Sequence, residues 1–142
     1  IFRGSKWLQN TKWVRIYEKE DLLYPELSYK ILGKAFNVWS EIGFGHKEAF
    51  YQKAMAGALK EDFEIKEQCP AKIVYNGRNI GIYYFDFLID NKIVLELKVR
   101  NYFSVKDIKQ LYSYLKSQKL KLGILAHFTR TGVKYKRVVN IA

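Results

Sequence analysis

The sequence contains little cysteine, proline or histidine and no long hydrophobic run. Its single cysteine, Cys69, cannot form an internal disulfide, which fits a reducing compartment and favours a buried thiol. No apolar stretch approaches the ~18 residues that a membrane span needs, and residues 1–10 lack the apolar centre of a signal peptide. We therefore expect a cytoplasmic protein without a membrane partner. Because the chain begins at Ile1, we expect either a processed product or a piece of a longer protein.

Several catalytic motifs are also missing. The chain has no phosphate-binding P-loop and no G-x-S-x-G nucleophile elbow. Its two histidines, His46 and His127, are isolated in sequence, and each is better explained as a structural residue than as a metal ligand. No His or Cys cluster therefore competes with a site built from oxygen ligands.

The residues that are present describe one compact domain of 142 residues with an uneven charge. The net charge is +11, yet the segment from Lys98 onward contains eleven basic residues and a single acid, Asp107. A one-sided basic field suits a polyphosphate, because each neutralised phosphate releases condensed counterions. A solvated basic surface or attraction to anionic lipid is the alternative, and we favour nucleic acid.

The hydrophobic pattern predicts a mixed α/β fold. Residues 1–24 are predicted to be an irregular N-terminal extension rich in basic and aromatic residues, followed by a domain over 25–142. We expect helices over 26–42, 46–60 and 105–117, and strands over 64–75, 80–89, 92–99, 120–128 and 133–141. The first strand is expected to be interrupted at Pro70. Asn76-Gly77 predicts a tight hairpin, and helices are expected to flank a central sheet.

Charged residues interrupt two otherwise apolar strands at Asp86, Glu96 and Lys98. A two-residue hairpin loop between these strands would place Asp86 and Glu96 on opposite faces of the sheet. A three-residue loop, residues 90–92, would place both acids and Lys98 on one face, and a bulge near Asp86 would do the same. The site hypothesis therefore demands one of the last two geometries.

Two opposed carboxylates repel each other unless a cation neutralises them. Oxygen ligands select Mg²⁺ or Mn²⁺, which can polarise a phosphate and activate a water molecule. The Lys98 ammonium could orient that water or stabilise the charge developing on the phosphate. The alternative is the polar face of an edge strand, since E-x-K triplets are common. The apolar context favours a site, because charges on central strands are costly unless they are paired or bind a metal.

Four ordered motifs carry a resemblance to a known family. They are Gly45 to Tyr51 (GHKEAFY), Phe85-Asp86-Phe87 with Ile93 to Lys98, Gln110 to Tyr114 (QLYSY), and Lys121 to Leu125. In these the chain resembles the GxxExxY branch of the PD-(D/E)XK nuclease superfamily over about residues 27–140. One departure is the Tyr83-Tyr84-Phe85 run, where members of this branch often have a basic or small residue.

The resemblance implies a restriction-endonuclease-like core, a mixed central β-sheet flanked by helices. It implies that Asp86 and Glu96 bind metal, with the Leu97 backbone carbonyl and Glu48 as further ligands, and that Lys98 is catalytic. It also implies that Gln110 and Tyr114 border the site and position substrate or Lys98. Each has a structural alternative: Glu48 suits a helix N-terminus, and Gln110 and Tyr114 could merely flank a buried stripe.

We therefore predict an Mg²⁺- or Mn²⁺-dependent nuclease that hydrolyses phosphodiester bonds in nucleic acid, with DNA favoured over RNA. The alternative is a non-catalytic nucleic-acid-binding module, or an accessory domain of a larger defence or repair protein that keeps the nuclease fold. Cutting both strands of a duplex with one active site would call for a homodimer.

Overall fold

The computed structural model describes residues 23–141. Most of the predicted N-terminal extension, residues 1–22, therefore lies outside the described residues. The last two residues of that extension, Leu23 and Tyr24, pack against the hydrophobic core. The domain predicted to begin at residue 25 opens with a helix that has Pro25 in its first turn, where the missing N–H costs nothing.

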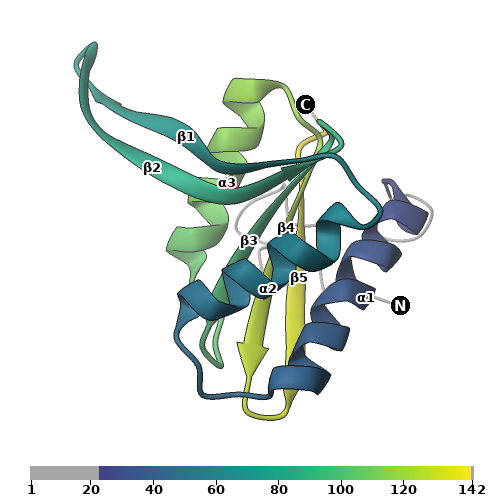
Figure 1. Cartoon of the computed structure of the whole chain (residues 1–142). Coiled ribbons are helices and arrows are strands. Elements are labelled where there is room, and N and C mark those ends of the chain that lie inside the picture. The colour runs from purple at the N-terminus through teal and green to yellow at the C-terminus, as the bar shows by residue number, and fades with distance from the viewer. Residues whose placement is uncertain (1–22, 142) are drawn as a thin grey trace.

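Three helices and five strands make up the described chain. They are α1 (Pro25–Ile42), α2 (Glu48–Lys60), β1 (Ile65–Tyr75), β2 (Arg78–Ile89), β3 (Ile93–Val99), α3 (Val105–Gln118), β4 (Leu122–Thr129) and β5 (Gly132–Val139). The helices α1 and α2 cover one side of the sheet and α3 covers the other (Figure 1). The predicted elements are confirmed with shifts of a few residues at their ends.

The sheet is mixed, and its strands follow the order β1-β2-β3-β4-β5. Antiparallel pairs join β1 to β2, β2 to β3 and β4 to β5, whereas β3 and β4 run parallel. A parallel pair needs a long crossover connection, and α3 supplies it. The prediction of a mixed central sheet flanked by helices is confirmed.

The predicted interruption of the first strand at Pro70 is wrong. β1 continues through this residue, which lies opposite Tyr84 on β2. Within the described chain β1 has a partner on one side alone, and an edge strand tolerates a residue without an N–H. The irregular position is Gln68, whose φ of 52° is left-handed and which lies opposite Asp86.

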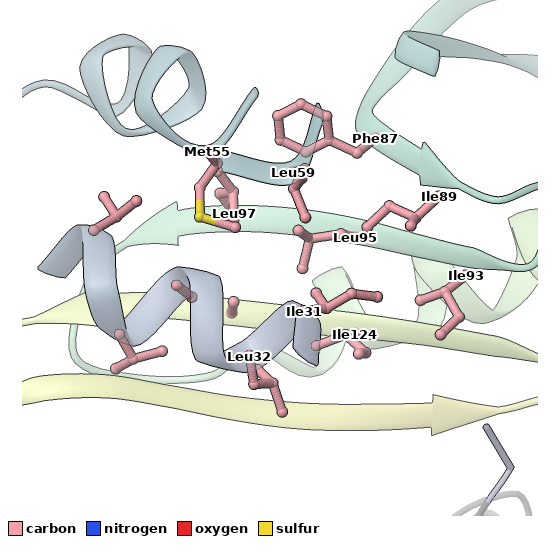
Figure 2. Packing of buried hydrophobic residues seen from close by; sticks show 14 of the residues in the cluster. Ile31, Leu32, Met55, Leu59, Phe87, Ile89, Ile93, Leu95, Leu97 and Ile124 are labelled. Carbon is pink, nitrogen blue, oxygen red and sulfur yellow. The ribbon is translucent and has the colours of Figure 1, made fainter. Parts of the chain in front are cut away.

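Alternation along β3 divides the core into two layers. Ile93, Leu95 and Leu97 face α1 and α2, where they meet fully buried side chains such as Ile31 and Met55 (Figure 2). The intervening Val94 faces the opposite layer, which contains Ile108, Leu111 and Leu115 of α3. Both faces of β3 are thus covered, so a charge on this strand cannot be an exposed surface feature.

Close packing of α3 on the sheet depends on Gly123 of β4. A Cβ atom at this position would lie 2.8 Å from Leu111 Cγ, and Leu111 is fully buried. We therefore expect Gly123→Ala to displace α3 and lower the unfolding free energy by about 1–3 kcal/mol, measured by urea denaturation.

Gly33 provides the matched control, because it lies within α1 and has open space around its would-be Cβ. Gly33→Ala should leave the unfolding free energy unchanged or raise it by up to about 1 kcal/mol. A Gly123→Ala variant as stable as Gly33→Ala would contradict the packing described.

Candidate active site

The ladder between β2 and β3 opens at Asp86 and Glu96. Ile89 pairs with Ile93 and Phe87 with Leu95, which requires the three-residue loop formed by residues 90–92. Asp90 and Asn91 both adopt positive φ there. This is one of the two registers that the site hypothesis demanded. The pairing stops after Phe87, so Asp86 and Glu96 form no backbone pair with each other.

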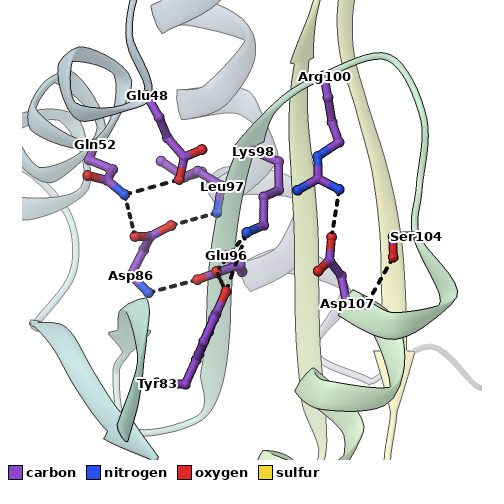
Figure 3. Close-up of polar contacts among 10 residues, drawn as sticks. All are labelled: Glu48, Gln52, Tyr83, Asp86, Glu96, Leu97, Lys98, Arg100, Ser104 and Asp107. Atoms are coloured by element: carbon purple, nitrogen blue, oxygen red, sulfur yellow. Dashed lines mark hydrogen bonds and ion pairs between the residues drawn. The ribbon is translucent and has the colours of Figure 1, made fainter. Parts of the chain in front are cut away.

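The two carboxylates replace the missing ladder bonds. The Asp86 backbone N–H donates to Glu96 Oε1 at 3.0 Å, and the Leu97 N–H donates to Asp86 Oδ2 at 2.8 Å (Figure 3). Each acid therefore accepts a hydrogen bond from the strand opposite its own. Asp86 is only 3% exposed and Glu96 only 4%, so the reciprocal bonds hold two buried carboxyl groups in the opening between the strands.

Helix α2 contributes Glu48 and Gln52 on one side of this opening. Gln52 Nε2 donates to Asp86 Oδ1 at 2.6 Å and to Glu48 Oε2 at 3.4 Å. The two α2 residues lie one turn apart and point toward Asp86 (Figure 3). Glu48 is thus connected to Asp86 through an amide. Gln52 is not among the predicted site residues, although its position four residues after Glu48 was a usable signal.

Tyr83 and Lys98 contact Glu96. The Tyr83 hydroxyl donates to Glu96 Oε2 at 2.5 Å, and Lys98 Nζ lies 3.6 Å from the same oxygen. Lys98 Nζ also donates to the Tyr83 hydroxyl at 3.4 Å. The three groups form a closed triangle of polar contacts (Figure 3). Tyr83 is a departure from the family pattern in the sequence, and no role was predicted for it.

Burial makes the negative charges of this site costly. Burial and, next, the nearby charge of Asp86 raise the pKa of Glu96 to about 7, although the hydrogen bond from Tyr83 and the charge of Lys98 oppose the shift. Burial likewise raises the pKa of Asp86, against the hydrogen bond from Leu97. The pKa of Glu48 is also raised by burial and lowered by Lys98. A bound positive charge would therefore stabilise the ionised forms of these three acids.

The donor chemistry fits a hard divalent cation. Asp86 and Glu96 offer oxygen ligands alone, which such cations prefer. Within residues 23–141 no group of three or more His, Cys, Asp or Glu side chains is arranged to hold a metal ion. A cation bound by the two acids would therefore need further oxygen atoms from backbone carbonyls, water or phosphate.

The other predicted site residues lie on α3, away from these contacts. Tyr114 is buried, and its ring lies 4.6 Å from that of Phe85, the neighbour of Asp86. Gln110 is half-buried on the same helix. Among the described contacts, no hydrogen bond joins either residue to Asp86, Glu96 or Lys98.

His127 lies opposite Lys98 in the β3–β4 register and packs against Phe103 at 4.0 Å between ring centroids. Both of its ring nitrogens are buried, and the backbone of Arg100 approaches without forming a well-aligned hydrogen bond. Burial, together with the charge of Arg100, lowers the pKa of His127 to about 4. The ring is therefore neutral near pH 7, as a structural histidine would be.

The segment between β3 and α3 brings one further basic group, Arg100, to this end of the sheet. Arg100 Nη1 lies 3.1 Å from Asp107 Oδ2, and the Ser104 side chain caps the start of α3 (Figure 3). Asp107 is the single acid among the basic residues of the last third of the chain. The charges of Asp107 and Arg100 offset each other in this ion pair. The net charge of the surrounding surface is therefore determined by the neighbouring lysines and is positive.

The five-stranded mixed sheet, its flanking helices and the acid pair in its centre define the restriction-endonuclease-like fold. The chain belongs to the PD-(D/E)XK nuclease superfamily, whose sequence model matches residues 25–138. Membership indicates nuclease chemistry, which in this superfamily typically uses divalent metal ions.

None of the helices in residues 23–141 is long and apolar enough to cross a membrane.

The crystal structure of SSO0001 is a similar solved structure, with a TM-score of 0.50 and 18% sequence identity. The match covers 82% of this chain and 58% of that chain, so the present chain spans less than two thirds of SSO0001. At this identity the likeness concerns the fold. Among curated proteins, no significant match was found.

The buried acid pair should lower the unfolding free energy of the protein when both acids are ionised. The pKa of Glu96, about 7 in the fold against 4.5 ordinarily, means that the native state binds this proton more tightly than the unfolded chain. Stability should therefore fall as the pH rises from about 4.5 to 7. In chelator-treated buffer at pH 8, Glu96→Gln should raise the unfolding free energy by about 1–3 kcal/mol.

Glu41→Gln, at an exposed position of α1, is the control and should change stability little. The measurement is urea denaturation of the three proteins at pH 5 and pH 8. A Glu96→Gln variant that is less stable than wild type at pH 8 would show that the repulsion is already relieved in the metal-free protein.

Proposed function

We propose that this protein is a metal-dependent phosphodiesterase that cleaves nucleic acid, with DNA as the favoured substrate. The observation that carries the proposal is the reciprocal pair of buried carboxylates, Asp86 and Glu96, with the Lys98 ammonium 3.6 Å from Glu96. A protein that only binds nucleic acid has no use for two opposed acids beside a phosphate. Membership in a nuclease superfamily supports the same chemistry.

In this proposal Asp86 and Glu96 hold Mg²⁺ or Mn²⁺ together with the backbone carbonyl of Leu97, and Glu48 is an additional acid near the ion. When bound, the cation would polarise the scissile phosphate and lower the pKa of a bound water. The proposed place of Glu48 near the ion is supported by the contact of its carboxylate with Gln52, which also donates to Asp86. The raised pKa values of both central acids support the proposed cation as well.

Lys98 is proposed to orient the attacking water or to stabilise the charge that develops on the phosphate. Lys98 lies two residues after Glu96 on β3, and its ammonium approaches Glu96 Oε2, the oxygen that also accepts the hydrogen bond from Tyr83. Gln110 and Tyr114 are proposed to border the site from α3, positioning substrate or Lys98. Gln52 and Tyr83 are proposed as positioning residues, because each holds an oxygen of one central acid.

We also assign the chain to the GxxExxY branch of the superfamily as part of this proposal. The support is the placement of that motif at the start of α2. Glu48 turns toward the acid pair, whereas Tyr51 is fully buried, stacks on Phe128 at 4.4 Å and donates to the Gly43 carbonyl. The motif would thus combine one residue of the site with one residue of the core.

DNA is favoured as substrate because the part of the chain from Lys98 onward carries eleven basic residues and a single acid, which suits a polyphosphate. We expect wild-type protein to degrade DNA with Mg²⁺ or Mn²⁺ and to stop when the metal is removed by EDTA. Glu96→Ala and Lys98→Ala should each lower the cleavage rate by at least about 100-fold, because each removes a group that acts on the reacting phosphate. Gel assays of linear and circular, single- and double-stranded DNA measure this directly.

Glu41→Gln and Lys30→Ala, both on the exposed surface of α1, are the charge-matched controls and should cleave at the wild-type rate. Binding of the same DNA in EDTA should persist in the Ala variants. If wild-type protein binds DNA and never cuts it, the protein is a binding module that keeps the nuclease fold.

The positioning role of Tyr83 has its own test. Tyr83→Phe keeps the ring and removes the hydroxyl that contacts both Glu96 and Lys98. Loss of a group that orients a metal ligand typically costs about 10–100-fold in activity or metal affinity. We expect a fall of that size in kcat, with KM nearly unchanged and a higher Mn²⁺ concentration needed for half-maximal rate.

Tyr84→Phe is the matched control, since Tyr84 is the next residue and is 50% exposed. It should behave as wild type in the same titration. Equal activity of the two Phe variants would show that the Tyr83 hydroxyl does not position Glu96 or Lys98.

A further inference from the structure

The outer part of the β1–β2 hairpin stands clear of the rest of the molecule (Figure 1). We call residues 72–82 the hairpin arm; its turn is Asn76-Gly77, with φ of 50° and 76°. A two-stranded ribbon without further packing is marginally stable in water. The arm nevertheless exposes large apolar side chains. They are Ile73, Val74, Tyr75, Ile80 and Ile82, each at least 44% exposed.

The arm and its base also lack negative charge. Between Gln68 and Phe85 the charged side chains are Lys72 and Arg78, and no acid occurs in this stretch. Exposed apolar and aromatic groups interleaved with cations fit a nucleic acid, whose phosphates attract the cations and whose bases stack on aromatic rings. A second copy of the same arm would bring like charges together, and the arm offers them no acid as a partner.

The register connects the arm to the acid pair on a single face of the ribbon. Cys69 pairs with Phe85, Ala71 with Tyr83, Ile73 with Gly81, and Tyr75 with Arg78. Side chains alternate along a strand, and the register shift between Ile73 and Val74 places its extra residue, Ile80, on β2. These alternate positions of β1 therefore share one face. Phe85 and Tyr83 place that face on the α3 side of the sheet, and the Tyr83 hydroxyl touches Glu96. The face therefore runs from the acid pair to Tyr75 and Arg78 at the tip.

We propose that this face of the hairpin arm is a nucleic-acid-binding surface that holds the substrate on one side of the scissile phosphate. Tyr75 and Arg78 form its distal contact, the Tyr75 side chain against a sugar of the DNA backbone and the guanidinium against a phosphate. The inference rests on the proposed nuclease function for the location of the scissile phosphate. It adds a second point of attachment that the acid pair does not supply.

The length of the arm predicts a substrate length. Arg78 precedes Asp86 by eight residues on β2, but the extra residue at the register shift means that this stretch spans seven positions of β1, or about 23 Å of extended strand. Duplex DNA advances about 3.4 Å per base pair, so the arm would reach about seven base pairs from the cleaved bond. Affinity should therefore rise when a duplex becomes long enough to cover both the acid pair and the tip.

The test compares wild-type protein with Tyr75→Ser, Arg78→Ala and the double variant. Both positions are exposed at the tip, so the substitutions spare the core. Tyr29→Ser and Lys30→Ala on α1 are matched controls, since Tyr29 is 81% exposed and lies on a different element. Binding is measured by fluorescence anisotropy in EDTA with labelled duplexes of about 6 and about 24 base pairs, at several salt concentrations.

We expect the double variant to bind the long duplex about 10–100-fold more weakly than wild type, with little change for the short duplex. Arg78→Ala alone should reduce the slope of log affinity against log salt by about 1. The α1 controls should match wild type. Equal affinities of wild type and double variant for the long duplex would overturn the proposal.

Two further outcomes separate this inference from the proposed function. Arm-dependent binding without any cleavage by wild type would support the arm and refute the nuclease. Normal cleavage and normal affinity in the double variant would refute the binding role of the arm alone.

Sedimentation of the same proteins tests a different role for the arm. If wild-type protein is a dimer and the double variant is a monomer with unchanged DNA affinity, the arm is a subunit interface and the proposal is overturned.

Discussion

The structure depends on one exchange of hydrogen bonds at the centre of its sheet. Where β2 and β3 separate, the N–H groups of Asp86 and Leu97 would lose their partners, and the carboxylates of Glu96 and Asp86 accept them instead. Buried backbone donors are costly when unpaired, so these two hydrogen bonds fix the positions of both carboxylates. The opening in the sheet and the acid pair therefore depend on each other. The opening frees two backbone N–H groups, and the two carboxylates are their hydrogen-bond acceptors.

Much of the fold could be predicted because its elements have strong local signals. The apolar repeat of α1, the Asn76-Gly77 turn and the alternation of β3 each specify one structure. The three-residue loop is one of the two predicted geometries that bring both acids to one face, the other being a bulge near Asp86. Pro70 misled because a strand pattern does not reveal which edge of a sheet the strand will occupy. β1 has a neighbour on one side alone among the described strands, so the missing N–H leaves the ladder intact.

The candidate site was predictable where charge interrupts apolar sequence, and not where a polar residue has an ordinary context. Asp86, Glu96 and Lys98 stood out for that reason. Gln52 lies on a helix surface where glutamine is common, and its one signal is its spacing of four residues from Glu48. Tyr83 lies in an aromatic strand and has no local signal. Their roles arise from tertiary contacts, in which α2 crosses the β2–β3 opening and Tyr83 reaches across to Glu96. Sequence shows the charges, while the groups that orient them become visible once the strands are placed.

The proposed substrate face depends mainly on β2, with Tyr75 of β1 beside it at the tip. β2 carries Asp86 at the opening, Tyr83 beside Glu96, and Arg78 at the tip of the hairpin arm, so this strand sets the spacing between the acid pair and the proposed distal contact. A site on a strand holds its geometry better than one on a loop. The cost is an arm whose apolar side chains meet water when no partner is bound, and a ligand along this face would remove that cost while bringing phosphate to Lys98. Binding and positioning would then be parts of a single event on β2.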